Sequence, residues 1–152
     1  MSRKLRLAFG SDPNATDLKD ALIAVARELG HAVDDLGATD PVYAHVATDV
    51  AAAVASGDYD RGVLLCGTGI GVSIAANKVP GAYCALLSDA YSAERAQLSN
   101  NANLISMGAQ TIGVEVAKVL LRRYLECEFD PNSRSGPKVA AITEYEERQV
   151  KA

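Results

Sequence analysis

A chain of 152 residues with a net charge of −4 is the size of one globular domain, and it lacks the basic surface expected of a nucleic-acid-binding protein. Although 49% of the residues are hydrophobic, no apolar run approaches the ~20 residues of a membrane span, so no membrane partner is expected. The three cysteines include no CxxC pair and the two histidines are too few for a histidine metal cluster. Neither a disulfide framework nor a metal site is predicted.

The first residues do not resemble a secretory leader, because they lack an apolar stretch and a small-residue cleavage site. Unpaired cysteines are typical of a reducing compartment. We therefore expect a cytoplasmic protein whose residues 1–152 form a single domain.

Strand-like and helix-like patterns alternate along the chain. Short apolar runs predict five strands, at 5–9, 32–36, 62–66, 83–87 and 104–107. Apolar residues at helical spacing predict helices between and after them, at 18–29, 46–54, 70–78, 90–98 and 114–125. This alternation predicts an α/β fold with a five-stranded parallel sheet covered by helices on both faces, a three-layer αβα arrangement.

An extra amphipathic helix is predicted over about 136–150, after the last strand. It has no further strand to lead into. It either covers its own sheet or packs on a partner subunit.

Parallel sheets bind ligands beyond the carboxyl ends of their strands. The turns at 10–12, 66–71 and 108–110 follow such ends and are candidates for a site. The segment 99–102, which precedes the fifth strand, is also polar enough to reach one.

The motif Cys66-Gly67-Thr68-Gly69-Ile70-Gly71 is the strongest local signal, because it joins a buried strand to a helix. Glycines let the backbone approach a ligand, and amides at a helix start bind anions. The spacing is not that of a dinucleotide or Walker loop. Taken alone, the glycines are equally typical of tight packing.

Cys66 gives this loop a chemical interpretation. A helix N-terminus favours the thiolate, whereas most free cysteines are small buried hydrophobes, as we expect of Cys84 and Cys127. A nucleophilic thiol needs a histidine partner; His31 lies at the wrong end of the sheet and nothing supports His45. A general base needs only a substrate proton and a hole for the resulting oxyanion. Proton abstraction beside a carbonyl therefore suits the loop better.

Five other residues give weaker signals. Asp12 either holds a substrate hydroxyl or forms an Asx turn, and Tyr43 either reaches the site or packs on its own helix. Asn100 either binds hydroxyls or ends a helix. Arg134 and Lys138, four residues apart on the predicted last helix, either clamp a phosphate or form a solvated face.

The chain resembles the ribose-5-phosphate isomerase B and galactose-6-phosphate isomerase family over nearly its whole length. Four segments carry the resemblance: Gly10-Ser11-Asp12, the loop Cys66–Gly71, Ala75-Ala76-Asn77-Lys78-Val79 and Ser99-Asn100-Asn101-Ala102. It implies a Rossmann-like homodimer or dimer of dimers with active sites shared between subunits. It also implies an aldose–ketose isomerase that interconverts ribose 5-phosphate and ribulose 5-phosphate, or a related sugar phosphate, through a cis-enediolate without metal or cofactor.

The same resemblance implies residue roles, with Cys66 as the base that moves a proton between C1 and C2. Val72 stands where another branch of the family has a glutamate base, so the chain resembles the cysteine branch. The resemblance implies an anion hole formed by Thr68 with the amides of Gly67, Gly69, Ile70 and Gly71. The implied sugar-binding residues are Asp12, Tyr43, Ser99 and Asn100. The implied phosphate clamp is Arg134 with Lys138 of the partner subunit.

Three positions depart from the family pattern. Pro13 and Ser99 replace histidines, the second of which opens the furanose ring, and Gln110 replaces a phosphate-binding arginine. A tetrose 4-phosphate cannot close a furanose ring and needs no such histidine. A tetrose-phosphate isomerase acting on erythrulose 4-phosphate is therefore an alternative. A non-catalytic sugar-phosphate-binding module is a second, and a thiol hydrolase a third.

Overall fold

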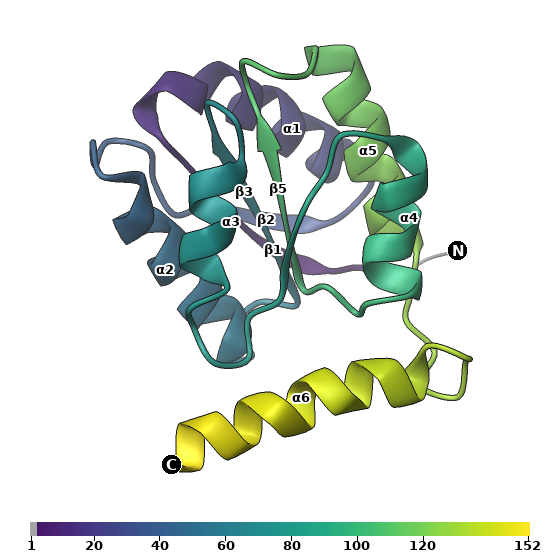
Figure 1. The fold of residues 1–152 in the computed structure, drawn as a ribbon. Coiled ribbons are helices and arrows are strands. Elements are labelled where there is room, and N and C mark those ends of the chain that lie inside the picture. Colours follow the sequence, from purple (N-terminus) through teal and green to yellow (C-terminus); the bar gives the residue numbers. More distant parts are fainter. Residues whose placement is uncertain (1–2) are drawn as a thin grey trace.

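The computed structural model describes residues 3–152 and contains a five-stranded parallel sheet of order β2-β1-β3-β5-β4 (Figure 1). The strands are β1 (Arg6–Ser11), β2 (Ala32–Asp35), β3 (Arg61–Cys66), β4 (Cys84–Leu86) and β5 (Leu104–Gly108). The helices are α1 (Thr16–Glu28), α2 (Tyr43–Ala55), α3 (Ile70–Ala76), α4 (Ala90–Leu98), α5 (Val114–Glu126) and α6 (Gly136–Lys151). The predicted Rossmann-like αβα class with an extra C-terminal helix is confirmed.

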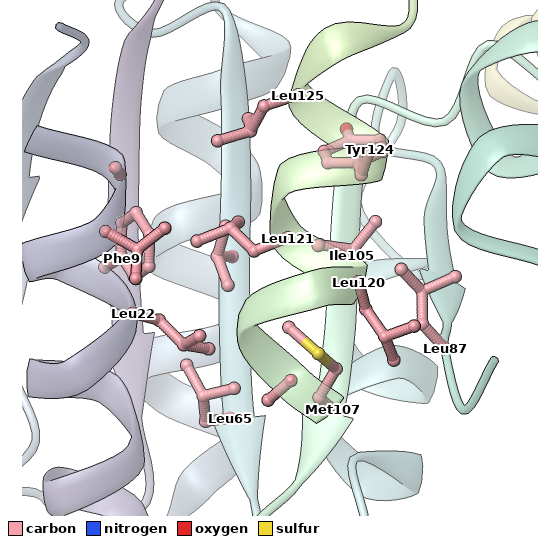
Figure 2. Packing of buried hydrophobic residues seen from close by; sticks show 14 of the residues in the cluster. Phe9, Leu22, Leu65, Leu87, Ile105, Met107, Leu120, Leu121, Tyr124 and Leu125 are labelled. Carbon is pink, nitrogen blue, oxygen red and sulfur yellow. The ribbon is translucent and has the colours of Figure 1, made fainter. Parts of the chain in front are cut away.

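Side chains alternate between two cores along the central strand β3, which is buried throughout. Val63 and Leu65 point to a core shared with α1, α4 and α5. Figure 2 shows Leu65 and Met107 of the sheet packing there against α1 and α5. Leu64 and Cys66 point the other way, toward α2 and α3. The strand pattern therefore directs Cys66 to the α3 side of the sheet.

The sequence places every predicted element within three residues of its observed ends, and two of the differences have local causes. β1 continues to Ser11, because Gly10 and Ser11 keep their parallel pairing with β3. α3 ends at Ala76 rather than 78, because the Asn77 side chain bonds the backbone N–H and carbonyl of Cys84 at 2.8 and 3.0 Å. That contact ties the end of α3 to the start of β4.

α6 extends across the end of the sheet where β4 and β5 begin (Figure 1). None of its residues is buried, and Glu146 attaches it to the loop before β4, accepting hydrogen bonds from the Gly81 N–H and the Tyr83 hydroxyl. Arg134 lies in the turn before the helix, so the prediction that Arg134 and Lys138 share one helical face is wrong. No helix among the described residues is long and apolar enough to cross a membrane.

Candidate active site

The Cys66 thiol lies at the carboxyl end of β3, where the strand turns toward α3. It is 7% exposed, and its Sγ accepts a hydrogen bond from the Gly69 N–H at 3.1 Å. An N–H directed at sulfur stabilises a thiolate more than a thiol. The geometry is therefore suited to a thiol that works as a base.

The loop holds this shape because two glycines let it lie directly on β5. Gly69 has φ = 78°, and a Cβ there would come within 2.8 Å of the Met107 backbone. A Cβ on Gly108 would come within 2.6 Å of the Thr68 backbone. Side chains at either position would push the loop off the strand.

Thr68 and the loop amides form the open side of the site. The exposed Thr68 accepts the Ile70 N–H at its Oγ1, at 3.2 Å, so its hydroxyl proton is free for a ligand. The Gly67 and Thr68 N–H groups bond to no other residue in 3–152. The anion hole therefore has fewer free N–H donors than the sequence predicts, because the Gly69 and Ile70 amides already donate hydrogen bonds within the loop.

Two predicted sugar-binding residues border this loop. A methyl group added at Gly71 would overlap the Tyr43 ring and come within 2.7 Å of its hydroxyl oxygen. Asp12 is held beside β3 by its own N–H, which donates to the Leu65 carbonyl at 2.9 Å. Its Oδ1 accepts the Asn14 N–H at 2.8 Å, which is the predicted Asx turn, and its Oδ2 has no partner among the described residues.

Gln110 covers the loop from the end of β5. Its N–H donates to the Gly67 carbonyl at 2.9 Å, and its side-chain oxygen lies 3.1 Å from where a Gly67 Cβ would be. A neutral amide therefore lies beside the loop at the position where an arginine was expected from the family pattern.

The remaining predicted residues lie at the opposite end of the sheet. Ser99 and Asn100 precede β5, whose five residues separate them from the loop by roughly 13 Å at the usual rise per residue. α6, which carries Lys138, crosses the same end. Lys138 and Arg134 are exposed and form no ion pair within residues 3–152. The segment 99–102, predicted to be polar enough to reach a site, therefore lies away from the Cys66 loop of its own chain.

Two contacts at these sites were not predicted from the sequence. The Arg95 Nε donates to the Ser99 hydroxyl at 2.6 Å, so Ser99 is paired with a cation. The buried Ser106 hydroxyl on β5 donates to the Gly69 carbonyl at 2.8 Å. The available signals were the four-residue spacing of Arg95 and Ser99 on a helix, and a lone hydroxyl in an apolar strand.

The other cysteines and histidines have partners of their own: the Cys84 thiol lies beside the Ser73 and Ser106 hydroxyls, and the His45 Nδ1 bonds the Asp40 carboxylate at 2.9 Å. Burial raises the pKa of Cys84 to about 11. Burial also raises the pKa of Cys127. For His31, burial and the nearby positive charge of Arg61 both lower the pKa. His31 lies at the start of β2, where its Nδ1 accepts the Leu5 N–H at 3.0 Å. Among residues 3–152, no three His, Cys, Asp or Glu side chains gather closely enough to hold a metal ion.

Known proteins share this fold and sequence over almost the full length of the chain. Residues 7–142 match the family model for ribose/galactose isomerases. D-erythrulose-4-phosphate isomerase of Pectobacterium atrosepticum is 42% identical, over 95% of this chain and 97% of its own. Ribose-5-phosphate isomerase B of Escherichia coli is 38% identical, over 95% and 98%. A mutant of type B ribose 5-phosphate isomerase from Trypanosoma cruzi superposes with a TM-score of 0.91 at 34% identity, covering 97% of this chain and 99% of that one.

A thiol and an open set of amides at the carboxyl end of a parallel sheet, in a chain this similar to those enzymes, define a sugar-phosphate isomerase. The predicted enzyme class is confirmed. The chain belongs to the ribose/galactose isomerase family, as its sequence motifs predict.

Proposed function

We propose that the protein interconverts an aldose phosphate and a ketose phosphate, with Cys66 as the base that carries a proton between C1 and C2. The observation that carries this proposal is the Gly69 N–H directed at the Cys66 Sγ, beside the unpaired amides of Gly67 and Thr68. A base and an oxyanion hole within one loop are what proton transfer beside a carbonyl requires.

In the aldose-to-ketose direction, the Cys66 thiolate removes the proton on C2. The electron pair left on C2 forms the C1–C2 double bond, and the carbonyl electrons move to O1. The amides of Gly67 and Thr68 and the Thr68 hydroxyl then stabilise the enediolate oxygen. Return of the same proton to C1, with transfer of the O2 proton to O1, gives the ketose and restores the thiolate. Because a single base removes and returns the proton on the same face of the substrate, the enediolate intermediate is cis.

The complete site needs two copies of the chain. The sheet separates Cys66 from Ser99, Asn100 and the cations Arg134 and Lys138, so one copy does not bring both groups to one substrate. We propose a homodimer, or a dimer of such dimers, in which each loop is completed by the other end of the partner.

Exposed apolar side chains at both ends of the sheet support this assembly. Near the loop, Ile70, Ile74 and Leu86 are 50%, 58% and 44% exposed, and at the opposite end α6 carries Ile142 and Tyr145 at 51% and 59%. Large exposed apolar side chains beside both halves of a site are typical of a protein–protein interface.

A tetrose 4-phosphate is the substrate that these residues favour. Ser99 has no titratable group, and its oxygen is held by Arg95, so it is not suited to protonating a ring oxygen. An open-chain tetrose needs no ring opening, and the 42%-identical relative is a D-erythrulose-4-phosphate isomerase. Ribose 5-phosphate is the second candidate, because the E. coli relative is a ribose-5-phosphate isomerase B. A cytoplasmic location suits a free-thiol base.

The test is isomerisation, with solvent-deuterium exchange at C1 and C2, on erythrulose 4-phosphate, ribose 5-phosphate and their free sugars. We expect the tetrose phosphate to give the higher kcat/KM. Cys66→Ala should abolish exchange, whereas Cys127→Ala, which removes a thiol beside Arg61 at the other end of the sheet, should retain it.

Three outcomes would contradict parts of the proposal. Full exchange by Cys66→Ala overturns the assigned base. Dominant activity on ribose 5-phosphate overturns the choice of tetrose. Sugar-phosphate binding without any exchange favours a binding module instead.

A further inference from the structure

Ser106 is a fully buried polar residue in the middle of β5, where it separates Ile105 from Met107. Its hydroxyl donates to the carbonyl of Gly69 at 2.8 Å, across 37 positions of sequence. Within residues 3–152, the one other donor to that carbonyl is the Ser73 N–H at 3.4 Å, which is long for a hydrogen bond. The hydroxyl of Ser106 is therefore the main partner of the Gly69 carbonyl.

Gly69 connects two peptide groups that both serve the loop. Its own N–H donates to the Cys66 Sγ at 3.1 Å. Its carbonyl belongs to the same peptide group as the Ile70 N–H, which donates to the Thr68 Oγ1 at 3.2 Å. The direction of both donors depends on the backbone angles of Gly69, which are φ = 78° and ψ = −6°.

We propose that Ser106 is a positioning residue for Cys66 and Thr68. By holding the Gly69 carbonyl, its hydroxyl keeps Gly69 in the conformation that directs one N–H at the thiol and the next at Thr68. The inference rests on the proposed function of Cys66 as the base. Ser106 itself touches no reacting atom, because it is buried behind the loop.

The physical reason is the freedom of glycine. A glycine populates both signs of φ with little preference, so an unanchored Gly69 has other conformations of similar energy. The Ser106 hydroxyl also polarises the peptide group it bonds, which strengthens the Ile70 N–H as a donor. Without the hydroxyl, a buried carbonyl keeps only one long contact, and rotation of the peptide relieves it.

The test uses variants matched to Ser106. Ser106→Ala removes the hydroxyl, and Ser106→Cys keeps the volume but offers only a weak donor. Ser106→Thr retains the hydroxyl and serves as the rescue. Val54→Ala is the control, because it opens space in the α2–α3 core beside Gly62, at the amino end of β3, without touching Ser106 or Gly69.

The first readout needs no substrate: the rate of Cys66 alkylation by iodoacetamide as a function of pH, followed by mass spectrometry of the peptide that contains Cys66. The second is the pH profile of kcat/KM. For Ser106→Ala and Ser106→Cys we expect alkylation at neutral pH and kcat to fall about threefold to tenfold, the loss of one net hydrogen bond. The ascending limb of both profiles should move to higher pH, with KM nearly unchanged.

Ser106→Thr should stay within about twofold of the wild type, and Val54→Ala should lower the melting temperature without moving either profile. The inference is overturned if Ser106→Ala and Ser106→Cys leave the alkylation profile in place, or if Val54→Ala moves it equally. If Ser106→Ala does not fold, Ser106→Cys decides alone. Retained exchange by Cys66→Ala would refute the proposed base, while the alkylation profile would still report on Ser106.

Discussion

A site divided between two chains predicts that two inactive variants will restore activity to each other. One variant is Cys66→Ala, damaged at the loop. The other is the double substitution Arg134→Ala with Lys138→Ala, damaged at the opposite end of the sheet. Each charge-assisted contact to a phosphate contributes about 1.5–3 kcal/mol, so the double variant should lose roughly 10²- to 10⁴-fold in kcat/KM.

Mixing equal amounts under conditions of subunit exchange gives mixed dimers with one intact and one doubly damaged site. Half of all dimers are then mixed, so activity should rise to about a quarter of the wild-type level. The assay is isomerase activity, with native mass spectrometry to confirm that mixed dimers have formed. Two variants damaged at the same end, Cys66→Ala and Cys66→Ser, are the control and should gain nothing.

The reasoning fails if mixed dimers form and activity stays at the level of the parents. Such a result would require Cys66 and the cations of one chain to reach one substrate, across the roughly 13 Å spanned by β5.

Three further predictions follow from contacts around the sheet. Gly71→Ala pushes the Tyr43 ring from the loop and should lower kcat/KM roughly tenfold to a hundredfold, with Tyr43→Ala adding little in that background, measured as a double-mutant cycle. Burial lowers the pKa of His31, so the unfolded chain binds a proton more readily than the folded chain does. The free energy of unfolding should therefore fall as the pH drops below about 6.5, by at most about 1.4 kcal/mol per pH unit. His31→Asn should flatten that slope in denaturant titrations. Glu146→Ala removes the hydrogen bonds that α6 accepts from the Gly81 N–H and the Tyr83 hydroxyl, and should increase hydrogen exchange over 136–151 more than elsewhere.

Most of the fold could be predicted because the signals are local. β3 is apolar at every interior position, as a strand covered on both faces must be, and 90–98 is helical over the whole range that its pattern predicts. Boundaries differed where side chains replace backbone partners, as Asn77 does for Cys84. Such contacts join residues that no periodic pattern connects.

The part of the site that is contiguous in sequence was also predictable. Cys66 and its loop are contiguous in sequence, so their chemistry can be read from residue types and spacing. The support that the loop receives from β5 could not be predicted. Ser106 lies 37 residues from Gly69, and the two come together only because β3 and β5 are neighbours in the sheet. The separation of Ser99 from Cys66 was missed for a related reason: a polar segment before a strand lies at the amino end of that strand, not at its ligand-binding end.

The opposite placement of the two groups has a consequence for how substrate choice can change. In the proposed dimer, the proton-transfer loop of one chain is fixed by β5 and its glycines, where the added Cβ atoms would meet backbone. Ser99 and its Arg95 partner belong to the end of α4, at the opposite end of the sheet from Cys66. Substitutions there alter what the partner holds against the loop without moving Cys66 or its amides. Ser99, one of the positions at which this chain departs from the family pattern, can therefore retune the sugar while the proton transfer stays the same.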